Sequence, residues 1–176
     1  MHNATLVFLV RSHKVVLALK KRGFGADKWN GIGGKQRPDE SVQDAAIRET
    51  FEEIGVRPVL GSPLGTIHYH NSSAGDWMVT VFVTSAFDGE PRETDEMRPQ
   101  WFSWDALPVN DMWDGDEHWI DRVCTNTPFR AEMWFDDQEH NVRHKVVSLL
   151  PGEAQEEGVN GNGPLSADHG RRKGGT

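Results

Sequence analysis

One long helical segment, Ser41 to Ile54, constrains the fold of this chain more than any other feature of the sequence. Its first residue is followed three positions later by Asp44, as in a capping box, and Gly55 is placed to end it. A second, shorter helix is predicted from about Asp116 to Cys124. Helices therefore occupy a minor part of the chain.

Most of the remaining sequence has the alternating or continuous apolar pattern of β-strands. The predicted strands are Thr5 to Val10, Lys14 to Leu19, Gly65 to His70, Trp77 to Ser85, Gln100 to Trp104, Phe129 to Phe135 and Val142 to Leu149. The first two are joined by a short polar turn and should form a hairpin. This pattern predicts an α/β fold in which one long helix packs on a sheet.

The chain has 176 residues, of which 36% are hydrophobic, so a single compact domain is expected over residues 1–150. From Pro151 to Thr176 the composition changes to Gly, Glu, Asn and Ser, and we expect a disordered tail. The longest apolar stretch is far short of a membrane span, and the N-terminus lacks the features of a secretory signal. A cytoplasmic monomer is the resulting expectation.

The net charge of −8 argues against polymeric nucleic acid as a partner, because such binding depends on neutralising phosphates with Lys and Arg. A small anionic ligand is compatible with this charge if a metal ion and a local basic patch offset it.

Three glutamates on the long helix, Glu49, Glu52 and Glu53, stand at i, i+3 and i+4 and share one side. Carboxylates this close repel one another, so their clustering favours a bound divalent cation. Oxygen ligands favour Mg²⁺, Mn²⁺ or Ca²⁺ over zinc. The alternative is a solvated acidic face. The residues expected on the opposite, buried side are Ile47, Phe51 and Ile54.

A glycine-rich turn, Asn30 to Lys35, precedes the helix and lets backbone approach a ligand closely. It lacks the spacing of a P-loop or a dinucleotide fingerprint. Gly34, then Glu40, then the run Arg48 to Val56 together match the Nudix box, with Thr50 as a departure where the family usually has an aliphatic residue. The sequence therefore resembles the Nudix hydrolases.

The resemblance extends over about Ala4 to Leu149 and narrows to the MutT-homologue subfamily, which acts on oxidised purine nucleoside triphosphates such as 8-oxo-dGTP. The segments that carry it are Lys20 to Ala26, Trp29 to Gly31, Asp95 to Pro99 with Trp101 and Phe102, and Asp111 to Trp113. The resemblance implies the Nudix α/β/α sandwich, a mixed β-sheet between helices. It also implies Mg²⁺, or Mn²⁺, as cofactor and hydrolysis of a triphosphate to monophosphate and pyrophosphate.

Site residues are implied by the same resemblance. The implied metal ligands are Glu49, Glu52, Glu53, the carbonyl of Gly34, and Glu96 from a separate loop. Arg48 is expected to orient the glutamates, and Glu40 to support the loop; either Glu52 or Glu53 is expected to take the proton from water. The implied base pocket contains Phe24 and Trp113 as aromatic faces, Asn30 and Asp116 at the base edge, and Thr5 and Lys20 in the lining.

The base pocket contains one departure from the subfamily. Where relatives have two consecutive aspartates, this chain has Gly115 and Asp116. Paired carboxylates can share a proton and so accept more than one base edge. We therefore hypothesise a narrower range of oxidised bases, unless Asp114 turns into the pocket.

Several alternatives stay open. The Nudix box specifies metal and diphosphate but not the base, so dinucleoside polyphosphates or ADP-ribose are rival substrates. A non-catalytic sensor with this fold would be expected to lose the glutamates that are present here. His68 and His70 share one face of a strand and could bind zinc, but the sequence indicates no third ligand.

Overall fold

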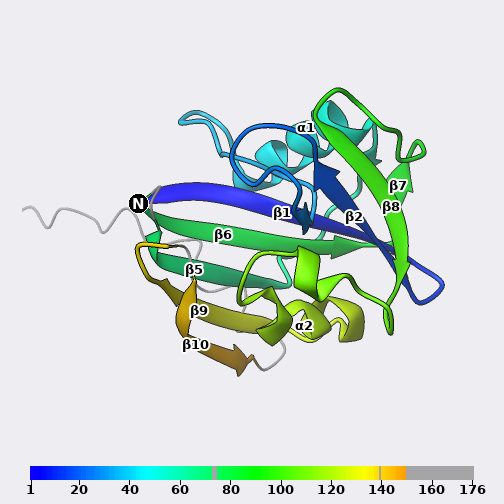
Figure 1. Ribbon diagram of the computed structural model, residues 1–176. Coiled ribbons are helices and arrows are strands. Elements are labelled where there is room, and N and C mark those ends of the chain that lie inside the picture. The colour runs from blue at the N-terminus through cyan, green and yellow to red at the C-terminus, as the bar shows by residue number, and fades with distance from the viewer. Residues whose placement is uncertain (73–74, 139, 150–176) are drawn as a thin grey trace, which may run out of the picture.

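The computed structural model describes residues 1–72, 75–138 and 140–149 (Figure 1). The predicted tail, Pro151 to Thr176, lies outside the described residues. The strands are β1 (His2–Arg11), β2 (Lys14–Lys20), β3 (Trp29–Asn30), β4 (Arg57–Pro58), β5 (Gly65–Ser72), β6 (Gly75–Thr84), β7 (Phe87–Asp88), β8 (Met97–Ser103), β9 (Phe129–Phe135) and β10 (Asn141–Ser148). The helices are α1 (Val42–Ile54) and α2 (Ile120–Thr125), with the 3₁₀ turns η1 (Val109–Asp111) and η2 (Asp116–His118).

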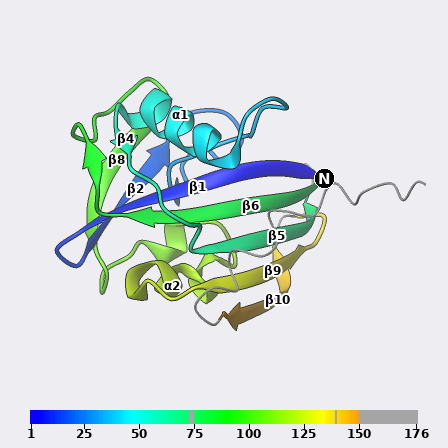
Figure 2. The ribbon, with the colours of Figure 1, turned by 180° about the vertical axis from the view of Figure 1, so that it is seen from behind.

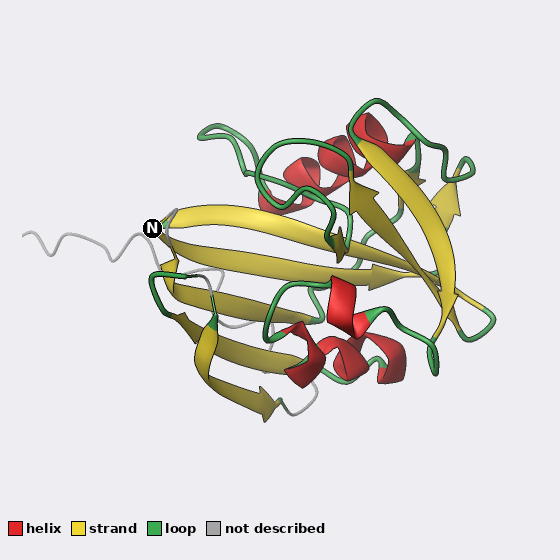
Figure 3. Cartoon of the chain, viewed as in Figure 1, coloured by secondary structure: helices red, strands yellow, loops and turns green. Residues whose placement is uncertain are grey.

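The main sheet has the strand order β10-β9-β5-β6-β1-β2-β3, with β8 paired to β2. The pairs β1–β6 and β5–β9 are parallel and the others are antiparallel, which confirms a mixed sheet. β2 stays paired with β1 only near the hairpin turn and then diverges towards β8 (Figures 1 and 3). Beyond the point where β2 diverges, Ile32 pairs with the free edge of β1 and exchanges two backbone hydrogen bonds with Val7.

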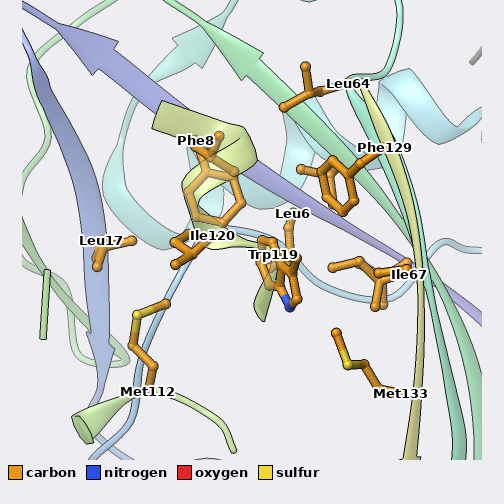
Figure 4. Close-up of a cluster of buried hydrophobic side chains, with 14 of the residues drawn as sticks. Leu6, Phe8, Leu17, Leu64, Ile67, Met112, Trp119, Ile120, Phe129 and Met133 are labelled. Carbon is orange, nitrogen blue, oxygen red and sulfur yellow. The ribbon is translucent and has the colours of Figure 1, made fainter. Parts of the chain in front are cut away.

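The two faces of β1 bury two separate apolar clusters, because side chains alternate along a strand. Leu6 and Phe8 pack with Trp119 and Phe129 on the face covered by η2 and α2 (Figure 4). Val7 and Leu9 belong to the cluster on the other face, which α1 closes with the residues Ala46 and Ile54. The predicted sandwich of a mixed sheet between helices is therefore confirmed, as the view from behind also shows (Figure 2).

The ends of α1 confirm the predicted signals. The side chain of Ser41 accepts a hydrogen bond from the backbone N–H of Asp44 at 3.1 Å, and Gly55 ends the helix in the left-handed region with φ of 75°. The predicted buried face was wrong in part. Phe51 lies on the side of α1 that faces solvent, where it is partly exposed and only the guanidinium of Arg57 covers its ring. Glu53 lies on another side of the helix and is buried.

The shorter predicted helix is divided, because η2 and α2 are separated by Trp119, whose backbone is not helical. The short strands β3, β4 and β7 have no counterpart among the predicted strands, since two residues give no detectable alternation. No helix among the described residues is long and apolar enough to cross a bilayer.

Candidate active site

The glycine-rich turn lies against both β1 and α1, and two of its glycines are required by close packing. A Cβ on Gly33 would collide with the carbonyl oxygen of Thr5. A Cβ on Gly34 would lie 2.5 Å from a carboxylate oxygen of Glu49. The turn can therefore bring its backbone next to the glutamates only because these two positions lack side chains.

Arg48 holds the acidic side of α1 in place through bonds to three carboxylates. Its guanidinium donates two hydrogen bonds to Glu40, at 2.6 and 2.8 Å, one to Glu49, and one to Glu52 at 3.1 Å. It also donates to the carbonyl of Lys35 at 3.1 Å, which ties the helix to the turn. The hydrogen bonds from Arg48 lower the pKa of Glu40 to about 2. This arrangement orients the carboxylates before any ligand binds.

Glu53 is the most enclosed of the helix glutamates, with 7% of its surface exposed. Its carboxylate accepts a hydrogen bond from the backbone N–H of Gly33 at 3.0 Å. Burial, with the charges of Glu49 and Glu96, raises the pKa of Glu53 to about 8. The protein environment therefore disfavours the ionised form of Glu53.

Glu96 reaches the same region from the loop before β8, where it forms an ion pair with Arg22 at 2.8 Å. The carbonyl oxygen of Gly34 accepts a hydrogen bond from the N–H of Thr5 at 2.9 Å, and its second lone pair can still bind a ligand. The donors gathered here are all oxygens, and burial disfavours the ionised form of Glu53. A divalent metal ion that prefers oxygen ligands fits both observations.

The raised pKa of Glu53 predicts a pH dependence for the metal-free protein. The folded state keeps the proton of Glu53 up to pH about 8, whereas the unfolded chain loses it near the ordinary value of 4.5. The contribution of Glu53 to folding stability should therefore fall as pH rises between these values, by about 1.4 kcal/mol per pH unit. Urea unfolding at pH of about 5.5 and about 7.5 measures this slope.

Two comparisons isolate the contribution of Glu53, because burial also raises the pKa of Asp116 to about 8 and adds a slope of the same sign. The variant Glu53→Gln should flatten the slope, and a saturating divalent metal should do the same in the unchanged protein. An identical slope in the variant would show that Glu53 is ionised throughout.

A pocket of about 840 Å³ has Gly33, Gly34 and Glu96 in its lining, and the N–H of Gly33 bonds to Glu53 behind it. It is bounded by β1, β2 and the loops that follow β2 and η1. Seven predicted site residues line it: Thr5, Lys20, Phe24, Asn30, Gly34, Glu96 and Trp113. The structure thus places five of the six predicted base-binding residues, all but Asp116, and part of the predicted metal site around one cavity.

Phe24 and Trp113 meet at one wall of the pocket, with ring centroids 5.1 Å apart and planes inclined at 34°. Gly25 allows this approach, since it has a φ of 81° and a Cβ there would lie 2.7 Å from the Trp113 ring. On another wall the hydroxyl of Thr5 is buried without a hydrogen-bond partner among the described residues. Such an unsatisfied polar atom suits a ligand with a complementary edge.

Asp116 is buried, and it lies behind the pocket wall rather than on it. Tyr69, which interacts with this carboxyl, stands on the wall. Asp114 accepts a hydrogen bond from the backbone N–H of Asn141 at 2.6 Å and does not line the pocket. The pocket residues that sequence reasoning missed include Tyr69, Trp77 and Phe135. These residues lie on strands, where the apolar pattern predicts which side chains face inward but does not predict that they line a ligand site.

The sequence is similar to known proteins over most of its length. A family described as NUDIX domain matches residues 1–123. The oxidized purine nucleoside triphosphate hydrolase of Danio rerio is 39% identical over 143 residues, which cover 81% of this chain and 92% of that protein. The Mus musculus protein of the same name is 38% identical over 136 residues, which cover 77% of this chain and 87% of that protein.

Solved structures are similar to this fold. The MutT protein from Bacillus halodurans superposes with a TM-score of 0.73 at 20% identity, over 83% of this chain and 97% of that one. The MutT NUDIX hydrolase from Burkholderia pseudomallei has a TM-score of 0.57 at 31% identity, over 61% of this chain and 86% of that one. The first likeness supports the architecture alone, because its sequence identity is low.

Proposed function

The chain belongs to the Nudix hydrolase family, and on that premise we propose that it converts oxidised purine nucleoside triphosphates, such as 8-oxo-dGTP, to monophosphate and pyrophosphate. One observation carries the proposal: an aromatic pocket lined by Phe24 and Trp113 also includes Gly33 in its lining, and the N–H of Gly33 bonds to Glu53 of the acidic helix. The two vertebrate relatives named above, which hydrolyse oxidised purine nucleotides by name, support the same substrate class.

The family uses a divalent metal, and we propose Mg²⁺ here, with Mn²⁺ as a substitute. The residues that would hold it are Glu49, Glu52, Glu53, Glu96 and the carbonyl of Gly34. When bound, the metal neutralises phosphate charge and lowers the pKa of water. Lys20, which lines the pocket, adds a positive charge for the phosphates.

The protein's own groups supply orientation and a proton acceptor. Arg48 fixes the directions of Glu49 and Glu52, and Glu40 in turn fixes Arg48. We propose Glu53 as the group that takes the proton from water, because it is enclosed next to Gly33, whereas Glu52 is half exposed and paired to Arg48 and Arg37. Hydrolysis by water needs no covalent nucleophile.

The direct test is kcat/KM with Mg²⁺ for 8-oxo-dGTP against dGTP, with ADP-ribose and a dinucleoside tetraphosphate assayed in parallel. We expect a preference for the oxidised nucleotide of at least about 100-fold, since a matched polar edge discriminates strongly. The products should be monophosphate and pyrophosphate. Equal rates for 8-oxo-dGTP and dGTP, or a preference for either rival, would keep the family chemistry and reject the base assignment.

The range of oxidised bases is expected to be narrow. Gly115 has no carboxylate, Asp114 is bonded to Asn141, and Asp116 lies behind Tyr69. The pocket therefore lacks a pair of carboxyls that could exchange a proton against two different base edges. We predict kcat/KM for 8-oxo-dGTP to exceed that for 2-hydroxy-dATP by about tenfold or more. Comparable values for the two nucleotides would contradict this reading.

The proposed substrate is a free nucleoside triphosphate rather than polymeric nucleic acid. A monomeric state and a cytoplasmic location remain predictions from the sequence, and mass measurement in solution tests the first.

A further inference from the structure

A second group of metal-ligating side chains lies outside the pocket, on the opposite face of the sheet. It consists of His68 and His70 on β5, Asp76 on β6 and Glu132 on β9. One potential ligand atom from each of His68, His70 and Asp76 lies within 4.8 Å of the other two. These three residues with Glu132 are called the histidine cluster below.

Strand register explains why these residues meet. His68 pairs with Met78 on β6 and with Glu132 on β9, so the three side chains lie on one face. Two residues along, His70 and Asp76 extend the same face. Tyr69 between the histidines points the other way and lines the nucleotide pocket. The histidine cluster and the pocket therefore lie on opposite faces of β5.

The contacts inside the histidine cluster match the needs of a metal ion. The imidazole rings of His68 and His70 have centroids 3.8 Å apart, a spacing that two charged rings would oppose. The Nε2 atom of His68 is buried without a hydrogen-bond partner among the described residues.

Glu132 is the outer partner of one of these ligands. Its carboxylate lies 3.3 Å from Nε2 of His70, where it can accept a hydrogen bond and fix the orientation of that imidazole. His70 is also held by stacking on Trp134, with planes at 8°. Two imidazoles and one carboxylate form a donor set that suits zinc and similar transition metals rather than Mg²⁺.

We propose that His68, His70 and Asp76 of the histidine cluster bind one Zn²⁺ ion, separate from the catalytic metal, which thereby links β5 to β6, with Glu132 of β9 holding His70. The sequence pattern indicated only two ligands because Asp76 is brought to His68 and His70 by strand pairing. The ion would stabilise the fold by binding the native arrangement alone.

The test is calorimetric titration of untagged protein with Zn²⁺ in saturating Mg²⁺, so that the acidic helix is already occupied. We expect one Zn²⁺ per chain, a rise in Tm, and a visible Co²⁺ spectrum of tetrahedral type. His70→Gln and Asp76→Asn should each weaken the affinity by more than about tenfold, since even an outer partner of a ligand is worth roughly 10–100-fold.

The control is His13→Gln, which removes an exposed histidine in the β1–β2 turn and should leave Zn²⁺ affinity unchanged. Turnover with Mg²⁺ checks that each variant is folded. Absence of Zn²⁺ binding under these conditions would overturn the proposal. So would unchanged affinity in both His70→Gln and Asp76→Asn, because the ion would then lie elsewhere.

Discussion

Glu53→Gln should lower kcat for the oxidised nucleotide by about 10²–10⁴-fold, the range that general acid–base groups contribute. The amide has the same shape but cannot accept the proton from water and is a weaker metal ligand. Because Glu53 is buried and its ionised form is disfavoured in the metal-free fold, folding should be kept. Single-turnover kinetics with saturating Mg²⁺ measures the loss, and circular dichroism with urea unfolding measures the fold.

The matched control is Glu90→Gln, which makes the same chemical change at an exposed side chain paired only loosely with Arg11. Its kcat should equal that of the unchanged protein. Near-normal turnover in Glu53→Gln would remove Glu53 from the proposed mechanism and would direct attention to Glu52. A stability in metal-free Glu53→Gln that exceeds the parent at pH of about 8 would agree with the raised pKa of the carboxyl.

Arg48→Met should destabilise the metal-free protein by about 3–5 kcal/mol, as expected when one partner of a largely buried ion cluster is removed. The side chain of Arg48 is 16% exposed, and those of its partners Glu40 and Glu49 are 13% and 18% exposed. Without the guanidinium these carboxylates would repel one another in an environment that hydrates them poorly. A fall in Tm of roughly 10 °C is the expected reading.

Arg37→Met provides the contrast, because Arg37 forms an exposed ion pair with Glu52 at 3.6 Å. The side chain of Arg37 is 62% exposed and that of Glu52 is 50% exposed. A surface ion pair of this kind contributes less than about 1 kcal/mol. Mg²⁺ should recover part of the loss in Arg48→Met by neutralising the same carboxylates. Equal stability of the two variants would show that the Arg48 cluster is effectively solvated.

The local signals of the sequence predicted the elements well where the physics is itself local. Ser41 and Gly55 mark the two ends of α1 in the sequence, because capping depends on a side chain and a backbone conformation within one helical turn. The long strands were found because their apolar residues run continuously where both faces are buried, as in β1, or alternately where one face is buried, as in β9. The division between η2 and α2 was missed, since it depends on how Trp119 packs against Phe8 and Phe129.

The orientation of α1 shows where local reasoning ends. Periodicity places Phe51 and Glu53 on different sides of the helix but does not say which side meets the turn. In the fold, the glycine-rich turn covers Glu53, while Phe51 packs under Arg57 at the surface. Burial of a carboxylate is therefore a tertiary property, and so is the pKa that follows from it.

By itself the sequence determined the acidic helix, the glycine-rich turn, the mixed α/β composition and the family resemblance, because each of these is written in residues near one another along the chain. Only the tertiary structure decided which glutamate is enclosed, that Tyr69 stands between the pocket and Asp116, and that three strands gather the histidine cluster. The physical reason is the same in each case: burial and strand register depend on contacts between segments far apart in sequence.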